Sequence, residues 1–269
     1  MTDNSRLIQL EMKGHIAWIT LNRPEKRNAL NLEMLENMVA LFQRLDQDIE
    51  TRVIVLKGEG KCFCAGMELA DLAGLIEKKS ADYRERLRKI ILYGQTSTNI
   101  IETCSKPVIL AAHSYCIGGG LDLACACDIR LATKTAVFSV RETKLALVAD
   151  LGTLQRLPKI VGEPWARELS LTGRDFSGED AYRIGFVTHI CEDESSLFQK
   201  AGELAREIAD NSPLAVQGVK DTLRFTSDHG AAAGLKYVAQ KNAAQLICDD
   251  GIEAIAAAIE KRKPVFKGR

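Results

Sequence analysis

The stretch CIGGGLDLACACD, residues 116–128, places three consecutive glycines directly before an acidic residue and an apolar run. Adjacent glycines permit a sharp turn with exposed backbone N–H groups, and the apolar run predicts a helix that carries Asp122 on its first turn. The helix dipole adds partial positive charge at such a turn, which suits an oxyanion. The same glycines would also serve close helix packing, with Asp122 only complementing the dipole.

Working outward from this stretch, short apolar runs predict buried strands on both sides of it. The predicted strands are His15–Leu21, Val53–Leu56, Val108–Ala112, Ile129–Ala132 and Val137–Val140. An amphipathic helix with Asn31 as its N-cap is predicted between the first two strands. Repetition of strand, turn and helix to about residue 140 favours an α/β layered core.

A second turn of small residues follows the strand at Val53–Leu56, and its sequence is CFCAGMEL, residues 62–69. This turn is the second candidate for presenting backbone donors. From Leu154 onward the pattern is helical, with little strand signal. The predicted helical segments are Arg167–Thr172, Glu179–Ile184, Leu197–Asp210, Pro213–Phe225 and Ala232–Ile259.

Composition excludes several classes of function. The chain has 269 residues, 46% of them hydrophobic, and equal totals of 36 basic and 36 acidic residues. A neutral chain gives no support for a nucleic-acid partner or an anionic membrane. The N-terminus does not resemble a signal peptide, no apolar run is long enough to cross a membrane, and the C-terminus lacks S-K-L. We therefore expect a soluble protein of the cytoplasm.

Cysteine and histidine spacing argues against a metal site. The eight cysteines lie mostly in apolar runs and occur at C-x-C spacing, as in Cys62/Cys64 and Cys125/Cys127. Buried, reduced thiols are expected from this pattern. The four histidines are scattered, with no H-x-x-x-H pair, so we expect no metal. His113, which precedes the glycine stretch, is expected to support that loop rather than to act as a base.

Four motifs, taken in order, resemble the crotonase (enoyl-CoA hydratase/isomerase) superfamily. They are LNRPEKRNALN at 21–31, CFCAGMEL at 62–69, KPVILAAHSYCIGGGLDLACACDIRLA at 106–132 and GTLQRLPKIVG at 152–162. The resemblance implies a spiral of ββα units with an acyl-CoA site, residues 1–200, and a C-terminal helical region for trimerisation, residues 201–269. It also implies a homotrimer or homohexamer. Coenzyme A would enter as part of the substrate, and no separate cofactor is implied.

The resemblance further implies where the thioester lies. By position in the motifs, the backbone amides of Met67 and Gly119 would hold the thioester oxygen as it becomes an enolate. Preorganised amides stabilise such a charge by several kcal/mol, on the order of 3 kcal/mol for one donor. The residues that would line the substrate are Ala65, Gly66, Met67, Glu68, Leu69 and Gly120.

The acids distinguish between reactions of the superfamily. Hydratases typically carry a glutamate after the glycines and another twenty residues later, and this chain has Asp122 and Glu142 at that spacing. A third acid, Asp150, makes the chain resemble the Δ3,5-Δ2,4-dienoyl-CoA isomerase subgroup of fatty acid β-oxidation. That reaction removes a proton from C2 and delivers one to C6. By resemblance, Asp150 would take the C2 proton, Glu142 would supply the C6 proton and Asp122 would orient the diene. The first two roles could be exchanged.

Other interpretations stay open at this stage. A 2-enoyl-CoA hydratase would use Asp122 and Glu142 to hold water, leaving Asp150 incidental. A non-catalytic acyl-CoA- or RNA-binding scaffold is a third possibility, which the neutral charge and the three acids oppose. Asp150 could instead cap the next helix through the amide of Thr153 or of Leu154. Asp128 is expected to pair with Arg130 or with a turn amide.

Overall fold

A six-stranded sheet with the order β1-β2-β3-β4-β6-β9 forms the centre of the structure, a computed structural model that describes residues 7–69 and 80–269. The β1–β2 pair is antiparallel, and every later pair in this sheet is parallel. The strands are β1 (Ile8–Lys13), β2 (Ile16–Leu21), β3 (Val53–Gly58), β4 (Val108–Ala112), β6 (Ile129–Thr133) and β9 (His189–Cys191). Strands β2 and β4 are buried along their whole length, as expected for strands covered on both faces.

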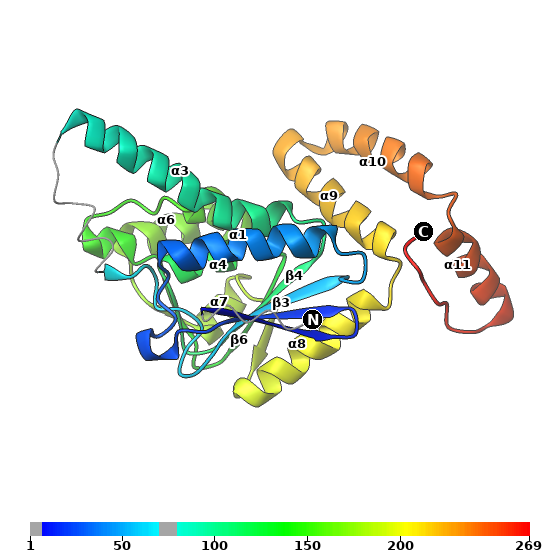
Figure 1. Cartoon of the computed structure of the whole chain (residues 1–269), viewed down its shortest axis with the longest axis horizontal. Coiled ribbons are helices and arrows are strands. Elements are labelled where there is room, and N and C mark those ends of the chain that lie inside the picture. The colour runs from blue at the N-terminus through cyan, green and yellow to red at the C-terminus, as the bar shows by residue number, and fades with distance from the viewer. Residues whose placement is uncertain (1–6, 70–79) are drawn as a thin grey trace.

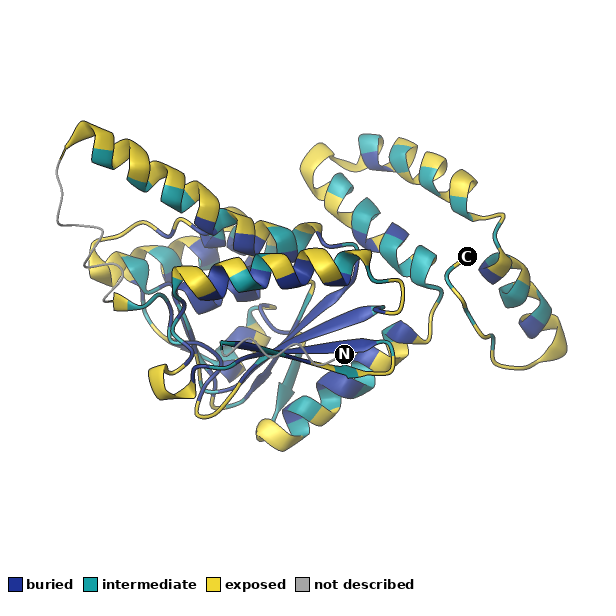
Figure 2. Cartoon of the chain, viewed as in Figure 1, coloured by how far each residue is buried: buried dark blue, intermediate teal, exposed yellow. Residues whose placement is uncertain are grey.

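Helices cover both faces of this sheet (Figure 1). On one face lie α1 (Leu32–Gln47) and α4 (Gly119–Ala126), whose apolar residues pack with Ile19 and Ile54. On the other face α8 (Glu194–Ala209) packs on Trp18 and Val55. Alternate residues of one strand therefore enter different cores, as the two-residue period of a strand requires. Figure 2 shows the central strands of the sheet as buried, whereas the edge strands β1 and β9 are partly exposed.

A second sheet of three short strands lies next to the glycine stretch. It has the order β5-β7-β8 and comprises β5 (Tyr115–Ile117), β7 (Val137–Ser139) and β8 (Phe176–Ser177). The aromatic rings of Phe138, Phe176 and Phe186 contact one another beneath it. Because β5 ends immediately before Gly118, this sheet sets the direction from which the glycine turn enters α4.

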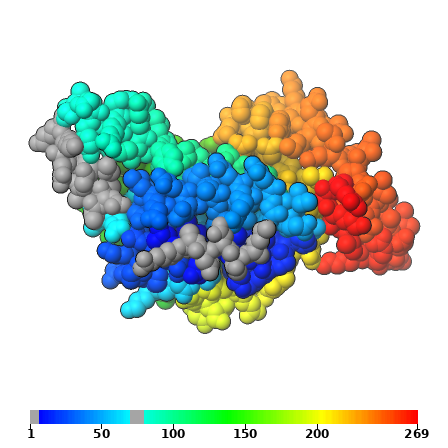
Figure 3. Space-filling view, viewed as in Figure 1, coloured from blue at the N-terminus to red at the C-terminus, as the bar shows by residue number. Residues whose placement is uncertain are grey.

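The remaining described helices are η1 (Pro24–Lys26), α3 (Ala81–Thr103), η2 (Glu142–Leu145), α5 (Thr153–Val161), α6 (Glu163–Thr172), α7 (Gly178–Arg183), α9 (Pro213–His229), α10 (Ala231–Gln245) and α11 (Asp249–Glu260). Figures 1 and 3 show α9, α10 and α11 extending to one side of the sheet layers. The domain division expected at residue 200 falls inside α8, which packs on the sheet, so the outlying helices begin at Pro213. No helix in the described ranges is long and apolar enough to cross a membrane.

Several sequence-based predictions are confirmed and others are wrong. The helix after Asn31 is confirmed, and the Asn31 side chain accepts a hydrogen bond from the Met34 amide at 2.9 Å. The helical pattern predicted over Ala232–Ile259 is broken, because α10 and α11 are separate helices and Cys248 caps the second. Strands β8 and β9 lie between the predicted helical segments, where no strand was predicted.

Candidate active site

The two small-residue turns touch each other. Cys64 and Cys116 form a parallel bridge, in which the Ile117 amide donates to the Cys64 carbonyl at 3.2 Å. Gly66 has a φ of 96°, and a Cβ on it would lie 3.2 Å from the Ile117 carbonyl oxygen and 3.8 Å from the Gly119 nitrogen. Only glycine fits this conformation and this approach without strain. The predicted donor segments, far apart in sequence, are therefore neighbours.

The predicted donor amides have no protein acceptor among the described residues. The Leu30 amide donates to the Gly66 carbonyl, and the Glu68 amide donates to the Leu30 carbonyl, both at 2.8 Å. These bonds lie on either side of Met67 and do not use the N–H group of Met67. Gly119 is the first residue of α4, where helix N–H groups lack intrahelical partners. A Cβ on Gly119 would lie 3.5 Å from the Met67 side chain. Two unsatisfied amides on touching turns meet the first requirement of an oxyanion hole.

A buried arginine and a buried asparagine hold the Met67 turn. Arg23 donates to the Glu68 carboxylate at 2.8 Å and to the Ala29 carbonyl at 2.7 Å. The hydrogen bond from Arg23 lowers the pKa of Glu68 against the opposing effect of burial, and Lys26 and the positive charge of Arg23 lower it further. The amide of the fully buried Asn28 side chain donates to the carbonyls of Glu59 and Cys62. Sequence reasoning assigned no role to Arg23 or Asn28, although both lie in the quoted motif at 21–31.

Asp122 lies buried in the first turn of α4, with 1% of its surface exposed. Its Oδ1 accepts a hydrogen bond of 2.7 Å from the amide of Thr153, the first residue of α5. Burial raises the pKa of Asp122 to about 7 against the opposing hydrogen bonds from Thr153, and the charges of Glu142 and Asp150 raise it further. Asp122 therefore makes the helix contact that had been considered for Asp150.

Glu142 begins η2 and lies beside the glycine turn. Its Oε1 is 3.3 Å from the position that a Cβ on Gly118 would occupy. Burial raises the pKa of Glu142, its own backbone amide opposes the change, and the charge of Asp150 raises it again. A carboxyl group with a raised pKa, next to a candidate oxyanion donor, is suited to exchange a proton with a bound acid or carbanion.

Asp150 precedes α5 in a segment whose backbone is held by α3. Its carbonyl oxygen accepts a hydrogen bond of 2.8 Å from the side chain of Gln95. The residue is exposed as a whole, but the protein around the carboxyl group displaces enough water to raise its pKa. The charge of Asp150 raises the pKa of both Asp122 and Glu142, so the three predicted acids lie within electrostatic range of one another. Among the described residues, none of the three forms an ion pair.

The other predicted substrate-lining residues differ in what surrounds them. Ala65 and Met67 are half-buried, while Leu69 is 63% exposed. Gly120 is buried and packs so closely on Cys64 that a Cβ there would lie 2.8 Å from the Cys64 Cβ, which indicates a packing role. His113 contacts the Gly60 carbonyl at 2.9 Å, so its partner lies in the turn after β3 and not in the glycine stretch that it was expected to support. No group of three metal-binding side chains occurs in the described ranges.

Comparison with known families and proteins places this geometry in context. The family model described as Enoyl-CoA hydratase/isomerase matches residues 11–269 of the chain. The chain belongs to the enoyl-CoA hydratase/isomerase family. The fold agrees with this membership, because the enoyl-CoA hydratase from Bacillus anthracis superimposes with a TM-score of 0.92 at 33% identity, covering 98% of this chain and all of the other.

Two curated relatives are more similar to this chain in sequence than the Bacillus anthracis hydratase is. The mitochondrial Δ(3,5)-Δ(2,4)-dienoyl-CoA isomerase of Dictyostelium discoideum is 43% identical, over 94% of this chain and 87% of the relative. The peroxisomal enzyme of the same name from Arabidopsis thaliana is 42% identical, over 97% of this chain and 95% of the relative.

The expectation of a cytoplasmic protein is wrong by this comparison. The names of both relatives place those enzymes in organelles, the mitochondrion for one and the peroxisome for the other. Cellular addresses are read from short terminal signals, and a folded domain of the enoyl-CoA hydratase/isomerase family does not itself reveal its compartment.

Proposed function

We propose that this chain is a Δ3,5-Δ2,4-dienoyl-CoA isomerase that moves the double bonds of a 3,5-dienoyl-CoA to the 2 and 4 positions in fatty acid β-oxidation. The observation that carries the proposal is the third carboxyl group, Asp150, whose charge raises the pKa of both Asp122 and Glu142. Isomerases of this name from Dictyostelium and Arabidopsis are 43% and 42% identical to the chain.

The reaction needs a base, an oxyanion site and a distant acid. Removal of a proton from C2 sends the electron pair of the C–H bond into a conjugated enolate, with its negative charge on the thioester oxygen. The amides of Met67 and Gly119 are the donors proposed for that oxygen. Protonation at C6 then returns the electron pair to carbon and leaves double bonds at C2 and C4. One proton is lost at C2 and one is gained at C6, so the substrate and product are isomers.

The position of Glu142 favours it as the base at C2. C2 is bonded to the carbonyl carbon, so its base must lie close to the amide that holds the carbonyl oxygen. Glu142 lies against Gly118, the residue before the proposed donor Gly119. Asp150 is then the proton donor at C6. This is the exchanged form of the assignment that the resemblance suggests, and it makes Asp122 the group that orients the diene.

The raised pKa values suit both roles. A base that works near neutral pH needs a pKa above that of an ordinary carboxyl group, and an acid must hold its proton until the enolate forms. Burial raises the pKa of Glu142 and of Asp150, the charge of Asp150 raises that of Glu142 further, and burial together with the charges of both groups raises the pKa of Asp122 to about 7. One of the three groups therefore retains a proton at a pH where isolated carboxylates are ionised.

A 2-enoyl-CoA hydratase is the second candidate, because the solved structure from Bacillus anthracis carries that name at 33% identity. Two substrates separate the candidates. With a 3,5-dienoyl-CoA, we expect a new long-wavelength absorbance from the conjugated 2,4-dienoyl thioester. With a 2-enoyl-CoA, we expect little loss of the enoyl-thioester absorbance, since rapid loss means hydration. Binding of both without either change would indicate a non-catalytic scaffold.

The variant Asp150→Asn tests the proton donor. Asparagine keeps the shape of the side chain but supplies no acidic proton, so we expect the isomerisation kcat to fall by about 10² to 10⁴-fold. The dissociation constant of the product 2,4-dienoyl-CoA, measured by calorimetry, is expected to stay within about 3-fold of the wild-type value, because binding of the product does not need the acidic proton of Asp150. Asp210→Asn is the control, since Asp210 lies after α8 and pairs with Lys263. An Asp150→Asn enzyme with wild-type kcat would contradict the assignment.

A further inference from the structure

The backbone around Asp150 is held by two polar side chains of α3. Gln95 donates to the carbonyl of Asp150 at 2.8 Å, and the hydroxyl of Thr98 donates to the carbonyl of Leu151 at 2.6 Å. Gly94 lies one turn before Thr98, and a Cβ on it would lie 3.1 Å from the Leu151 side chain. Helix α3 therefore lies directly against the segment that carries the proposed acid.

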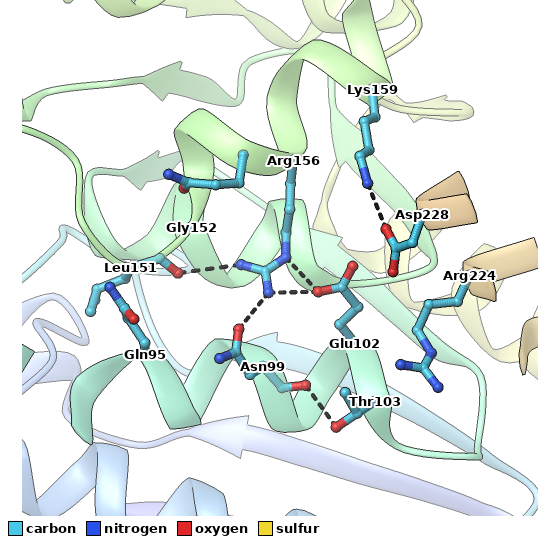
Figure 4. A pocket seen from close by; sticks show the side chains of 11 residues that line it. Gln95, Asn99, Glu102, Thr103, Leu151, Gly152, Arg156, Lys159, Arg224 and Asp228 are labelled. Atoms are coloured by element: carbon cyan, nitrogen blue, oxygen red, sulfur yellow. Dashed lines mark hydrogen bonds and ion pairs between the residues drawn. The ribbon is translucent and has the colours of Figure 1, made fainter. Parts of the chain in front are cut away.

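Arg156, from α5, closes the other side of the same segment. Its Nη1 donates to the Leu151 carbonyl at 3.4 Å, and a Cβ on Gly152 would overlap the guanidinium group. Its Nε and Nη2 donate to Glu102 at 2.9 and 2.6 Å, and Nη2 also donates to Asn99 at 2.8 Å. Figure 4 shows the guanidinium group reaching these three partners, two on α3 and one on the Asp150 segment.

The Arg156 side chain is only 11% exposed, although a cavity of about 390 Å³ lies beside it. A desolvated guanidinium group requires partners for its donors, and here the Glu102 carboxylate and two oxygens supply them. A lysine at this position would place one point charge near Glu102 and would lack the flat fork that spans α3 and the loop. The planar group thus joins α3, α5 and the loop at one point.

The carboxyl group of Asp150 forms no hydrogen bond or ion pair with another side chain in the described ranges. Its position is therefore set by the backbone of residues 150–152. We propose that Arg156 is a positioning residue that holds the Asp150 carboxyl group where it delivers a proton to C6. The inference rests on the proposed function and on the assignment of Asp150 to C6. Arg156 itself does not touch the reacting carbons.

The variant Arg156→Met separates the two proton transfers. In deuterium oxide, removal of the C2 proton by Glu142 followed by reversal places deuterium at C2 of the remaining 3,5-dienoyl-CoA. A displaced Asp150 slows protonation at C6 but not this exchange. We expect kcat for isomerisation to fall by about 10 to 100-fold, because a misplacement of about 1 Å has effects of that size. Deuterium exchange at C2, measured by mass spectrometry, should stay within about 3-fold of the wild-type rate, as that step is untouched.

If Arg156 had a purely structural role, Arg156→Met would lower the rates of exchange and of isomerisation by the same factor, because the substitution would change only the amount of folded enzyme. That parallel loss overturns the proposal, and so does an unchanged kcat. Arg156→Lys is the second variant, since it keeps a cation beside Glu102 and preserves the fold should Arg156→Met be insoluble. In Arg156→Lys, kcat for isomerisation should again fall more than the rate of deuterium exchange at C2, but by a smaller factor than in Arg156→Met. Arg167→Met is the control, because Arg167 forms an exposed pair with Glu163 on α6.

Guanidinium ion provides a rescue test in Arg156→Ala. The truncated side chain leaves space that joins the neighbouring cavity of about 390 Å³, and the small cation fits the same partners. Millimolar guanidinium should restore kcat by at least about 5-fold, whereas equal urea should not, because it lacks the charge that Glu102 requires. Absence of rescue in a folded Arg156→Ala protein counts against positioning. A wild-type enzyme that forms no 2,4-dienoyl product would instead refute the proposed function.

Discussion

Asp122 illustrates how one carboxyl group can have both a structural and a chemical effect. Its Oδ1 accepts the Thr153 amide at the start of α5, which fixes α5 relative to α4. Burial holds its pKa near 7, so the group changes charge in the range where the enzyme would work. A carboxylate at a helix N-terminus is favoured electrostatically, but burial with two neighbouring acids opposes its ionisation. In this site burial outweighs the hydrogen bonds.

The pKa of Asp122 leads to a prediction about stability. A pKa of about 7 in the folded protein, against 3.8 for an ordinary aspartate, means that the unfolded chain releases the proton first as the pH rises. The free energy of unfolding should therefore decrease between about pH 4 and pH 7, by on the order of 2–4 kcal/mol. Urea unfolding at several pH values measures this decrease. Asp122→Asn should make the curve flatter, and identical slopes for the two proteins would contradict the prediction.

At the scale of elements, a buried lysine attaches α9 to the sheet layers. The Lys220 amine donates to Asp128 at 2.7 Å, to the Lys106 carbonyl at 3.0 Å and to the Ile101 carbonyl at 3.3 Å. The same Asp128 oxygen accepts from the Val108 amide at 2.7 Å. One carboxylate thus links α9, the start of β4 and the end of α4. Asp128 was expected to pair with Arg130 or with a turn amide, and its partners are instead Lys220 and the amide of Val108, the first residue of β4.

Arg130, the alternative partner considered for Asp128, points elsewhere. Its Nε donates to the Phe186 carbonyl at 2.7 Å, and its Nη1 donates to the Cys127 carbonyl at 2.6 Å. Arg130 therefore holds the turn that follows α7 against the end of α4. Arg130 is closer to Asp128 in sequence, but Lys220 is the partner of Asp128, because α9 places Lys220 next to it in the folded chain.

The prediction at this scale is that Asp128→Ala destabilises the protein by about 2–4 kcal/mol, because it leaves a buried amine without a counter-ion and a strand amide without an acceptor. Guanidinium-chloride unfolding measures the change. The double variant Asp128→Ala/Lys220→Met should recover part of the loss, since the uncompensated charge is gone. Additive losses in the two single variants would show that the pair is not coupled.

At the scale of the whole molecule, α9, α10, α11 and the connection between α10 and α11 expose many large apolar side chains. They are Val219, Leu223, Leu235, Val238, Leu246, Ile247, Ile252, Ile255 and Ile259. A groove of about 1010 Å³ lies among these helices and is lined mainly by apolar atoms. Apolar surface on this scale is typical of a protein–protein interface. We propose that it is covered by other copies of the chain in a homotrimer or homohexamer.

Sedimentation velocity tests this assembly, and we expect three or six times the mass of one chain. Leu223→Arg should shift the protein toward the monomer, because it places a charge in the apolar surface of α9, where Leu223 is 67% exposed in the single chain. Ile49→Arg is the matched control, since Ile49 is 83% exposed after α1 and far from α9 in sequence. A monomeric wild-type protein would refute the proposed assembly.

The sequence by itself determined the order of elements and the family. Apolar runs such as Val108–Ala112 and the Asn31 cap are local signals, so strand β4 and helix α1 were predictable from a few neighbouring residues. The motifs also identified Asp122, Glu142 and Asp150 as candidates. Strands β8 and β9 were not predictable, because strands of two or three residues are stabilised by pairing with β7 and β6 rather than by their own pattern.

The tertiary structure alone decided which groups meet. The closeness of Glu142 to Gly118 is the reason for our proposal that the base and the acid exchange the roles expected from the sequence, and the Thr153 amide donates to Asp122 rather than to Asp150. The roles of Arg23 and Arg156 depend on partners on other elements, Glu68 and Glu102. Hydrogen bonds and charge coupling act over a few ångströms in space, and residues that are distant along the chain reach that range only after folding.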